Sequence, residues 1–122
     1  MSDAAPLGAL DGVRIVDLTQ MLAGPFFTML LADQGAEIIK VEPLDGDHTR
    51  IVGPYHDDDK LRAFGGYFAS VNRNKKSVAI DLKRPEGRDL VMRLCDGADA
   101  VVENYRGGVM DRLGLGYESL HE

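Results

Sequence analysis

A repeated order of short apolar segments and helix signals is the feature that most constrains the fold. Residues 13–18 (VRIVDL) are apolar and β-branched, which is typical of a buried strand. Gly24 and Pro25 then predict a helix with proline at its first position, which FFTMLLADQ continues until Gly35 ends it in a left-handed conformation. Residues 36–42 (AEIIKVE) predict a second strand. A strand, a helix and a strand in this order predict a parallel pair with a right-handed crossover.

The same order returns later in the chain. Residues 77–82 (SVAIDL) predict a strand, and Pro85 restarts a helix. The buried face of this helix is predicted from apolar residues at helical spacing, namely Leu90, Val91, Leu94 and Ala98. Residues 99–104 (DAVVEN) predict another strand, with a short helix after it that ends at Leu113. Residues 43–70 are rich in turns, and FGGYFAS within them is either a short helix or irregular. This alternation predicts an α/β fold with a mainly parallel sheet and flanking helices.

Length and composition narrow the class of protein. The 122 residues are enough for one domain, and 44% hydrophobic residues are ordinary for a globular protein. The longest apolar run is too short to span a bilayer, so no membrane association is expected. The N-terminus lacks the basic region of a secretory signal, and the one cysteine, Cys95, is expected to be an inert packed thiol without a disulfide partner. A cytoplasmic location is therefore expected.

The charge is unevenly distributed. The net charge of −6 argues against a nucleic-acid partner, yet residues 71–93 hold seven basic and three acidic side chains. Such a basic island in an acidic chain suits a small anion better than a polymer. A solvated face with scattered lysines explains the same residues equally well. His56 and the three aspartates after it could bind a hard cation, but their spacing favours a solvated surface loop, so no metal is expected.

Ligands of parallel α/β sheets bind beyond the carboxyl ends of the strands, which here are followed by TQMLAG, EPLDGD, KRPEG and NYRGG. The glycine-rich loops that bind dinucleotides and nucleoside triphosphates are absent. Tyr105 could stack on a purine, Gly107 and Gly108 would let the backbone approach closely, and Lys83, Arg106 or Arg112 could contact phosphates. These residues suit an adenine nucleotide that carries several phosphates and no metal. Tyr105 as a cover of the core and the basic residues as solvated side chains are the structural alternatives.

Four segments in this order resemble the class III CoA-transferases, the CaiB/BaiF family that includes formyl-CoA transferase. They are LDGVRIVDLTQMLAGP, LADQGAEIIKVEPLDGD, NRNKKSVAIDLKRPEGR and ADAVVENYRGGVMDRLGLGYESL. The resemblance covers nearly the whole chain and implies that residues 1–122 are the N-terminal part of a larger Rossmann-like domain that binds coenzyme A. It also implies an interlocked homodimer for the full-length protein, with an acyl-CoA and a carboxylic acid acceptor as substrates.

By the same resemblance, four groups of residues would contact coenzyme A. They are Leu22 and Ala23; Ile80, Asp81, Leu82 and Lys83; Asn104, Tyr105 and Arg106; and Arg112. Two positions depart from the family: Pro43 stands where a basic residue contacts CoA, so Arg50 could assist instead, and Gln20 replaces a histidine of some relatives. Leu22 and Ile80 could equally be ordinary core residues.

The resemblance places the nucleophilic aspartate of the family beyond residue 122, so no catalytic residue is assigned and the fragment alone is expected to be inactive. Two alternatives stay open. An α-methylacyl-CoA racemase would share the fold and the CoA site, and a non-catalytic CoA-binding or structural module would need no reaction centre.

Overall fold

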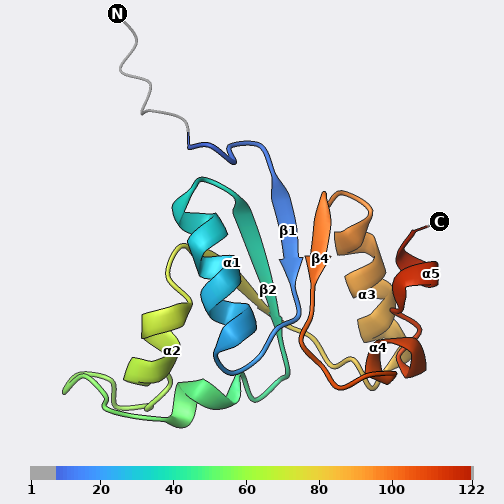
Figure 1. Cartoon of the computed structure of the whole chain (residues 1–122). Helices are drawn as coiled ribbons and strands as arrows, with labels where there is room; N and C mark the ends of the chain where they lie inside the picture. Colours follow the sequence, from blue (N-terminus) through green and yellow to red (C-terminus); the bar gives the residue numbers. More distant parts are fainter. Residues whose placement is uncertain (1–7, 122) are drawn as a thin grey trace, which may run out of the picture.

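The computed structural model describes residues 8–121, which form one four-stranded parallel sheet (Figure 1). The strands are β1 (Arg14–Asp17), β2 (Glu37–Glu42), β3 (Lys75–Ala79) and β4 (Ala100–Val102). Their order across the sheet is β3–β2–β1–β4, and every neighbouring pair is parallel. All carboxyl ends therefore meet at one edge, the lower one in Figure 1. The predicted α/β class with a mainly parallel sheet is confirmed.

Helices cover both faces of the sheet (Figure 1). On one face lie α1 (Ala23–Asp33), α2 (Gly66–Val71) and the short 3₁₀ helix η1 (His48–Ile51). On the other lie α3 (Pro85–Cys95), α4 (Val109–Arg112) and α5 (Tyr117–Leu120). The change of face follows from strand order, because the chain leaves β3 at one edge and crosses to β4 at the other. The strand order therefore reverses between β1 and β4, and open α/β sheets bind their ligands at such a reversal.

The core follows the two-residue period of the strands. Val16 and Leu18 point to the α3 side, where they pack in one cluster with Val91. Ile15 and Ile38 point to the other side and pack near Ala32 of α1. Burial of each such side chain contributes about 1.5–3 kcal/mol relative to exposure. The predicted buried strands and helices thus meet in two apolar layers around one sheet.

Three details of the sequence prediction are wrong. Pro25 is the third residue of α1, because the helix begins at Ala23. The third strand is Lys75–Ala79 instead of residues 77–82, since the carboxylate of Asp81 accepts the N–H of Lys83 and turns the chain. Leu90 is 48% exposed, because Gly87 and Val91 are the residues of α3 that face the sheet.

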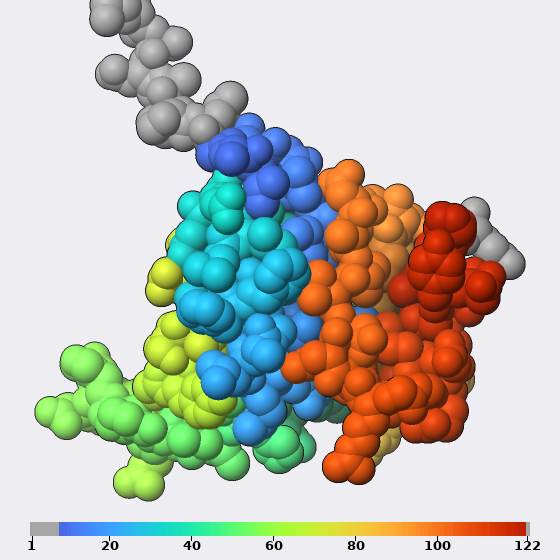
Figure 2. Space-filling view, viewed as in Figure 1, coloured from blue at the N-terminus to red at the C-terminus, as the bar shows by residue number. Residues whose placement is uncertain are grey.

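The turn-rich middle of the chain adopts the short helix α2 that FGGYFAS allowed. The segment between η1 and α2 projects from the body of the molecule, at the lower left of Figure 2. Among the described helices, none has the length and apolarity that crossing a bilayer requires.

Candidate functional site

A pocket of about 360 Å³ opens at the carboxyl edge of the sheet. It lies where the loops after all four strands come together, next to the reversal of strand order. The residues that line it are Gln20, Val41, Glu42, Pro43, Leu44, Asp45, Ile80, Asp81, Leu82, Lys83, Tyr105 and Leu113. Its position is the one expected for the ligand site of an open α/β sheet.

The structure brings five of the ten predicted contact residues together in this pocket: Ile80, Asp81, Leu82, Lys83 and Tyr105. The other five do not line it. Leu22 and Ala23 are exposed at the start of α1, and Asn104 and Arg106 are exposed in the loop after β4. Arg112 is exposed on α4, next to the lining residue Leu113.

The loop after β3 is held close to α3. The carboxylate of Asp81 accepts the backbone N–H of Lys83 at 3.0 Å, and the Asp81 carbonyl accepts that of Arg84 at 3.2 Å. Gly87 allows this approach, because a Cβ at that position would overlap the Asp81 carbonyl oxygen. The loop therefore presents Lys83 at the pocket in a defined position.

Tyr105 belongs to both the pocket and the core. Its ring packs against the cluster that contains Val16 and Leu18, and it also lines the pocket. Burial raises the pKa of the Tyr105 hydroxyl; the nearby side chain of Gln20 acts in the opposite direction, and the charge of Glu103 adds to the increase. The hydroxyl therefore stays protonated at neutral pH and can donate a hydrogen bond.

A buried network of charges lies beneath the pocket, between the sheet and η1. Glu42 is 3% exposed and forms two hydrogen bonds with Arg50, each of 2.7 Å. Burial by itself raises the pKa of Glu42, but hydrogen bonds from Arg50, Ser77 and the Asp47 backbone outweigh it and lower the pKa to about 2. Arg50 also donates to the Ala63 carbonyl and lies 3.6 Å from the ring centroid of Phe68. Its guanidinium is thus held by contacts within the described chain, and assistance of Arg50 in CoA binding stays a prediction.

Two lysine side chains of the sheet, one inside the predicted strand 36–42 and one before the predicted strand 77–82, are buried. The Lys40 ammonium donates to the Thr19 carbonyl at 2.8 Å and pairs with Asp47 at 3.0 Å. The Lys75 ammonium pairs with Asp17 at 3.1 Å, and burial, the largest influence, lowers its pKa while Asp17 opposes the change. Sequence reasoning missed both groups. The available signal was the lysine inside the otherwise apolar segment 36–42; Lys75 lies outside the predicted strand and carried no such signal.

The basic island divides into two parts. Arg73, Lys75 and Lys76 lie at the start of β3, away from the pocket, and each pairs with an acid. The interpretation of the whole island as a site for a small anion is therefore wrong for these residues, whose charges are balanced by acids. Lys83, by contrast, lies at the pocket, and within residues 8–121 neither it nor Arg106 nor Arg112 forms an ion pair.

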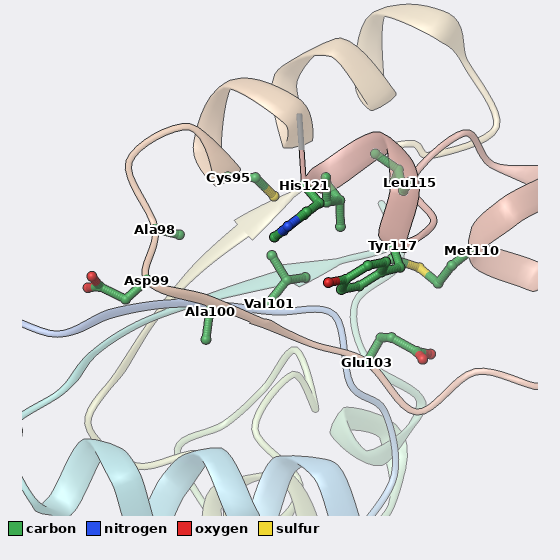
Figure 3. A pocket seen from close by; sticks show the side chains of 11 residues that line it. Cys95, Ala98, Asp99, Ala100, Val101, Glu103, Met110, Leu115, Tyr117 and His121 are labelled. Carbon is green, nitrogen blue, oxygen red and sulfur yellow. The ribbon is translucent and has the colours of Figure 1, made fainter.

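A second pocket, of about 480 Å³, lies beside β4 (Figure 3). It contains none of the predicted contact residues, and its lining is mostly apolar, with Val101, Met110 and Tyr117 among its members. Burial raises the pKa of the Cys95 thiol there, and the charge of Asp96 adds to the effect, in agreement with an unreactive thiol. In residues 8–121, no group of three or more His, Cys, Asp or Glu side chains is arranged to hold a metal ion.

Comparisons with known proteins define the class. The sequence model of CoA-transferase family III matches residues 10–122, so the chain belongs to this family. It is 50% identical over 116 residues to the succinyl-CoA:mesaconate CoA-transferase of Haloarcula hispanica, covering 95% of this chain and 29% of that protein. It is 50% identical over 120 residues to the succinyl-CoA:glutarate CoA-transferase of Mus musculus, covering 98% of this chain and 27% of that protein.

A solved structure agrees with the assignment. A CaiB/BaiF family protein from Brucella suis is 44% identical, with a TM-score of 0.88 over 94% of this chain and 30% of that one. The chain therefore spans less than a third of the length of each of these relatives. The family resemblance read from the four sequence segments is confirmed.

Proposed function

We propose that residues 1–122 are the N-terminal part of a CoA-binding domain, and that the full-length protein moves CoA between an acyl-CoA and a carboxylic acid. The pocket at the carboxyl edge of the sheet carries this proposal. It combines a half-buried aromatic ring, an apolar wall and a lysine with no ion pair in the described chain. This combination of surfaces suits a phosphorylated adenine nucleotide.

Each residue has a role in the proposed complex. The Tyr105 ring stacks on the adenine, and Ile80 and Leu82 form the apolar wall beside it. Lys83 and Arg112 contact phosphates, and Arg106 adds positive charge at the same edge of the sheet. The proposed contact set is completed by Leu22, Ala23 and Asp81.

The relatives named above use succinyl-CoA with mesaconate or glutarate. We propose the same type of reaction here, with an acyl-CoA donor and a carboxylic acid acceptor. The family resemblance supplies the nucleophile from a part of the protein beyond residue 122. A carboxylate there attacks the thioester and releases CoA thiolate as an acyl–aspartyl anhydride forms, which divides one transfer into easier steps. This chain contributes binding and orientation of the nucleotide.

The interlocked homodimer and the cytoplasmic location are part of the same proposal. The outer side of α1 carries exposed Phe26, Phe27 and Leu30, and Leu22 at its N-cap is exposed as well, each at least 41% accessible. A helix that is apolar on all sides is normally covered by other parts of a larger protein. The apolar surface of α1 therefore supports an assembly that extends beyond this chain.

Titration calorimetry of the full-length protein with CoA tests the proposed site. The variant Lys83→Met removes a charge-assisted contact worth about 1.5–3 kcal/mol, so we expect an affinity loss of about 10- to 140-fold. Arg112→Ala is expected to weaken binding for the same reason. Lys60→Met is the matched control, because Lys60 is exposed on the projecting segment between η1 and α2. Unchanged affinity in both site variants would reject the assignment.

Product analysis tests the reaction. Incubation with an acyl-CoA and a carboxylic acid should yield the CoA thioester of the acceptor. Exchange of the α-hydrogen of a 2-methylacyl-CoA for solvent deuterium, without transfer, would instead identify a racemase. CoA binding with neither reaction would identify a binding module.

A further inference from the structure

The side chain of Asn104 bridges two loops of the pocket. Its Oδ1 accepts the backbone N–H of Gln20 at 2.8 Å, and its Nδ2 donates to the backbone carbonyl of Gln20 at 2.8 Å. The two residues are 84 positions apart in the sequence. Gln20 follows β1, whereas Asn104 follows β4. A carboxamide that satisfies both backbone groups of one residue acts as a neighbouring strand would.

This bridge continues the pairing of β1 with β4 beyond the last paired backbone groups. The N–H of Leu18 donates to the Val102 carbonyl at 2.8 Å, and beyond this bond the two strands are no longer paired. Gln20 and Tyr105 follow on the two separating loops, and both line the pocket. The carboxamide of Asn104 therefore sets the distance between two of its walls.

The loop after β1 is held from its other side as well. The Thr19 carbonyl accepts the buried ammonium of Lys40 at 2.8 Å, and the same ammonium pairs with Asp47 in the loop after β2. Thr19 and Gln20 are thus joined to the loop after β2 through Lys40 and to the loop after β4 through Asn104. All three loops contribute residues to the pocket.

Asn104 differs from Lys40 in its exposure. Lys40 is 1% exposed, so its loss would disturb the fold, whereas Asn104 lies at the surface. Water can replace the hydrogen bonds of a surface carboxamide when it is removed, so its contribution to unfolding is small. Water molecules would not, however, hold Gln20 and Tyr105 at a fixed distance from each other.

We propose that Asn104 is a positioning residue, which orders Gln20 and Tyr105 around the pocket before a ligand enters. This role rests on the proposed CoA site and differs from the direct CoA contact that the family resemblance implies for Asn104. Pre-ordered walls reduce the conformational entropy lost on binding. The affinity for CoA should therefore depend on Asn104 only as long as Tyr105 is present to be positioned.

Amide hydrogen exchange on the full-length protein without ligand tests the bridge. In Asn104→Ala, we expect the Gln20 amide to exchange at least about 10-fold faster, while the thermal midpoint is unchanged. Asn104→Asp is a second variant of equal size, which keeps the acceptor and replaces the donor by an oxygen facing the Gln20 carbonyl. Gln34→Ala is the control, because Gln34 is an exposed carboxamide that donates to the Leu30 carbonyl. Unchanged Gln20 exchange in both Asn104 variants would overturn the proposal.

A double-mutant cycle with CoA separates positioning from direct contact. Asn104→Ala should weaken binding about 5- to 10-fold in the parent, and have less than about 2-fold effect when Tyr105→Ala is already present. Equal effects in both backgrounds would show an independent contact and overturn the positioning role. If the parent does not bind CoA, the proposed function fails, while the exchange experiment still decides whether the bridge orders the loops.

Discussion

The ion pair of Glu42 with Arg50 gives a quantitative prediction, tested by the substitution Glu42→Gln. The Glu42 carboxylate accepts two hydrogen bonds from Arg50, one from the Asp47 backbone at 2.8 Å and one from Ser77. Glutamine keeps the shape but places an N–H₂ donor against these donors. The variant therefore loses the charge and leaves the largely buried guanidinium without its partner.

Two estimates of the magnitude agree. Removal of one partner from a buried ion pair typically costs about 3–5 kcal/mol. The pKa of Glu42 falls from its ordinary 4.5 to about 2, and at about 1.36 kcal/mol per pH unit this is at most about 3 kcal/mol. Arg50 keeps its contact with the Ala63 carbonyl and with the Phe68 ring, which favours the lower end. We expect a loss of about 3 kcal/mol in the free energy of unfolding at pH 7.

The pH dependence provides the second signature. Because the pKa of Glu42 is lower in the folded than in the unfolded protein, its contribution is fully present above about pH 4.5 and is lost as the pH falls to about 2. The difference in stability between the parent and Glu42→Gln should therefore shrink by more than half between pH 7 and pH 3.

Urea unfolding of the full-length protein, followed by circular dichroism at both pH values, measures this difference. Glu37→Gln is the control, because Glu37 pairs with Arg14 and Lys76 at the surface and should matter much less. The reasoning is refuted if Glu42→Gln costs no more than Glu37→Gln at pH 7, or if its cost is independent of pH.

Two further predictions concern packing. Gly87→Ala should cost about 1–3 kcal/mol of unfolding free energy, because the added Cβ meets the backbone of Asp81. Gly97→Ala is the control and should be near neutral, because its Cβ meets only the flexible end of Arg14. Equal costs for the two variants in thermal scans would contradict this prediction. The isolated 122-residue chain should self-associate through the exposed side of α1. Sedimentation should show less association for Leu30→Glu, and a monomeric parent would contradict the prediction.

Much of the pocket could be predicted from sequence patterns. Gly35 marks the end of one helix and Pro85 the start of the next. The apolar runs identify strands, and the carboxyl ends of parallel strands must share one edge of the sheet. That rule placed the loop after β3 near the loop after β4, and the pocket is lined by residues of both, including Lys83 and Tyr105. The family resemblance narrowed the same loops to individual residues, but it did not separate lining residues from their neighbours. Arg112 and Leu22, for example, do not line the pocket.

The order of elements was therefore determined by the amino-acid sequence, because periodicity, glycine and proline act over a few residues. Partnerships over long separations were decided by the tertiary structure. Lys75 pairs with Asp17 across 58 positions, and Asn104 holds Gln20 across 84. Such pairs depend on which strands become neighbours and on which face each side chain points to. The basic island is divided for the same reason. Lys75 and Lys76 pair with acids at the amino end of β3, whereas Lys83 follows its carboxyl end, where the pocket lies.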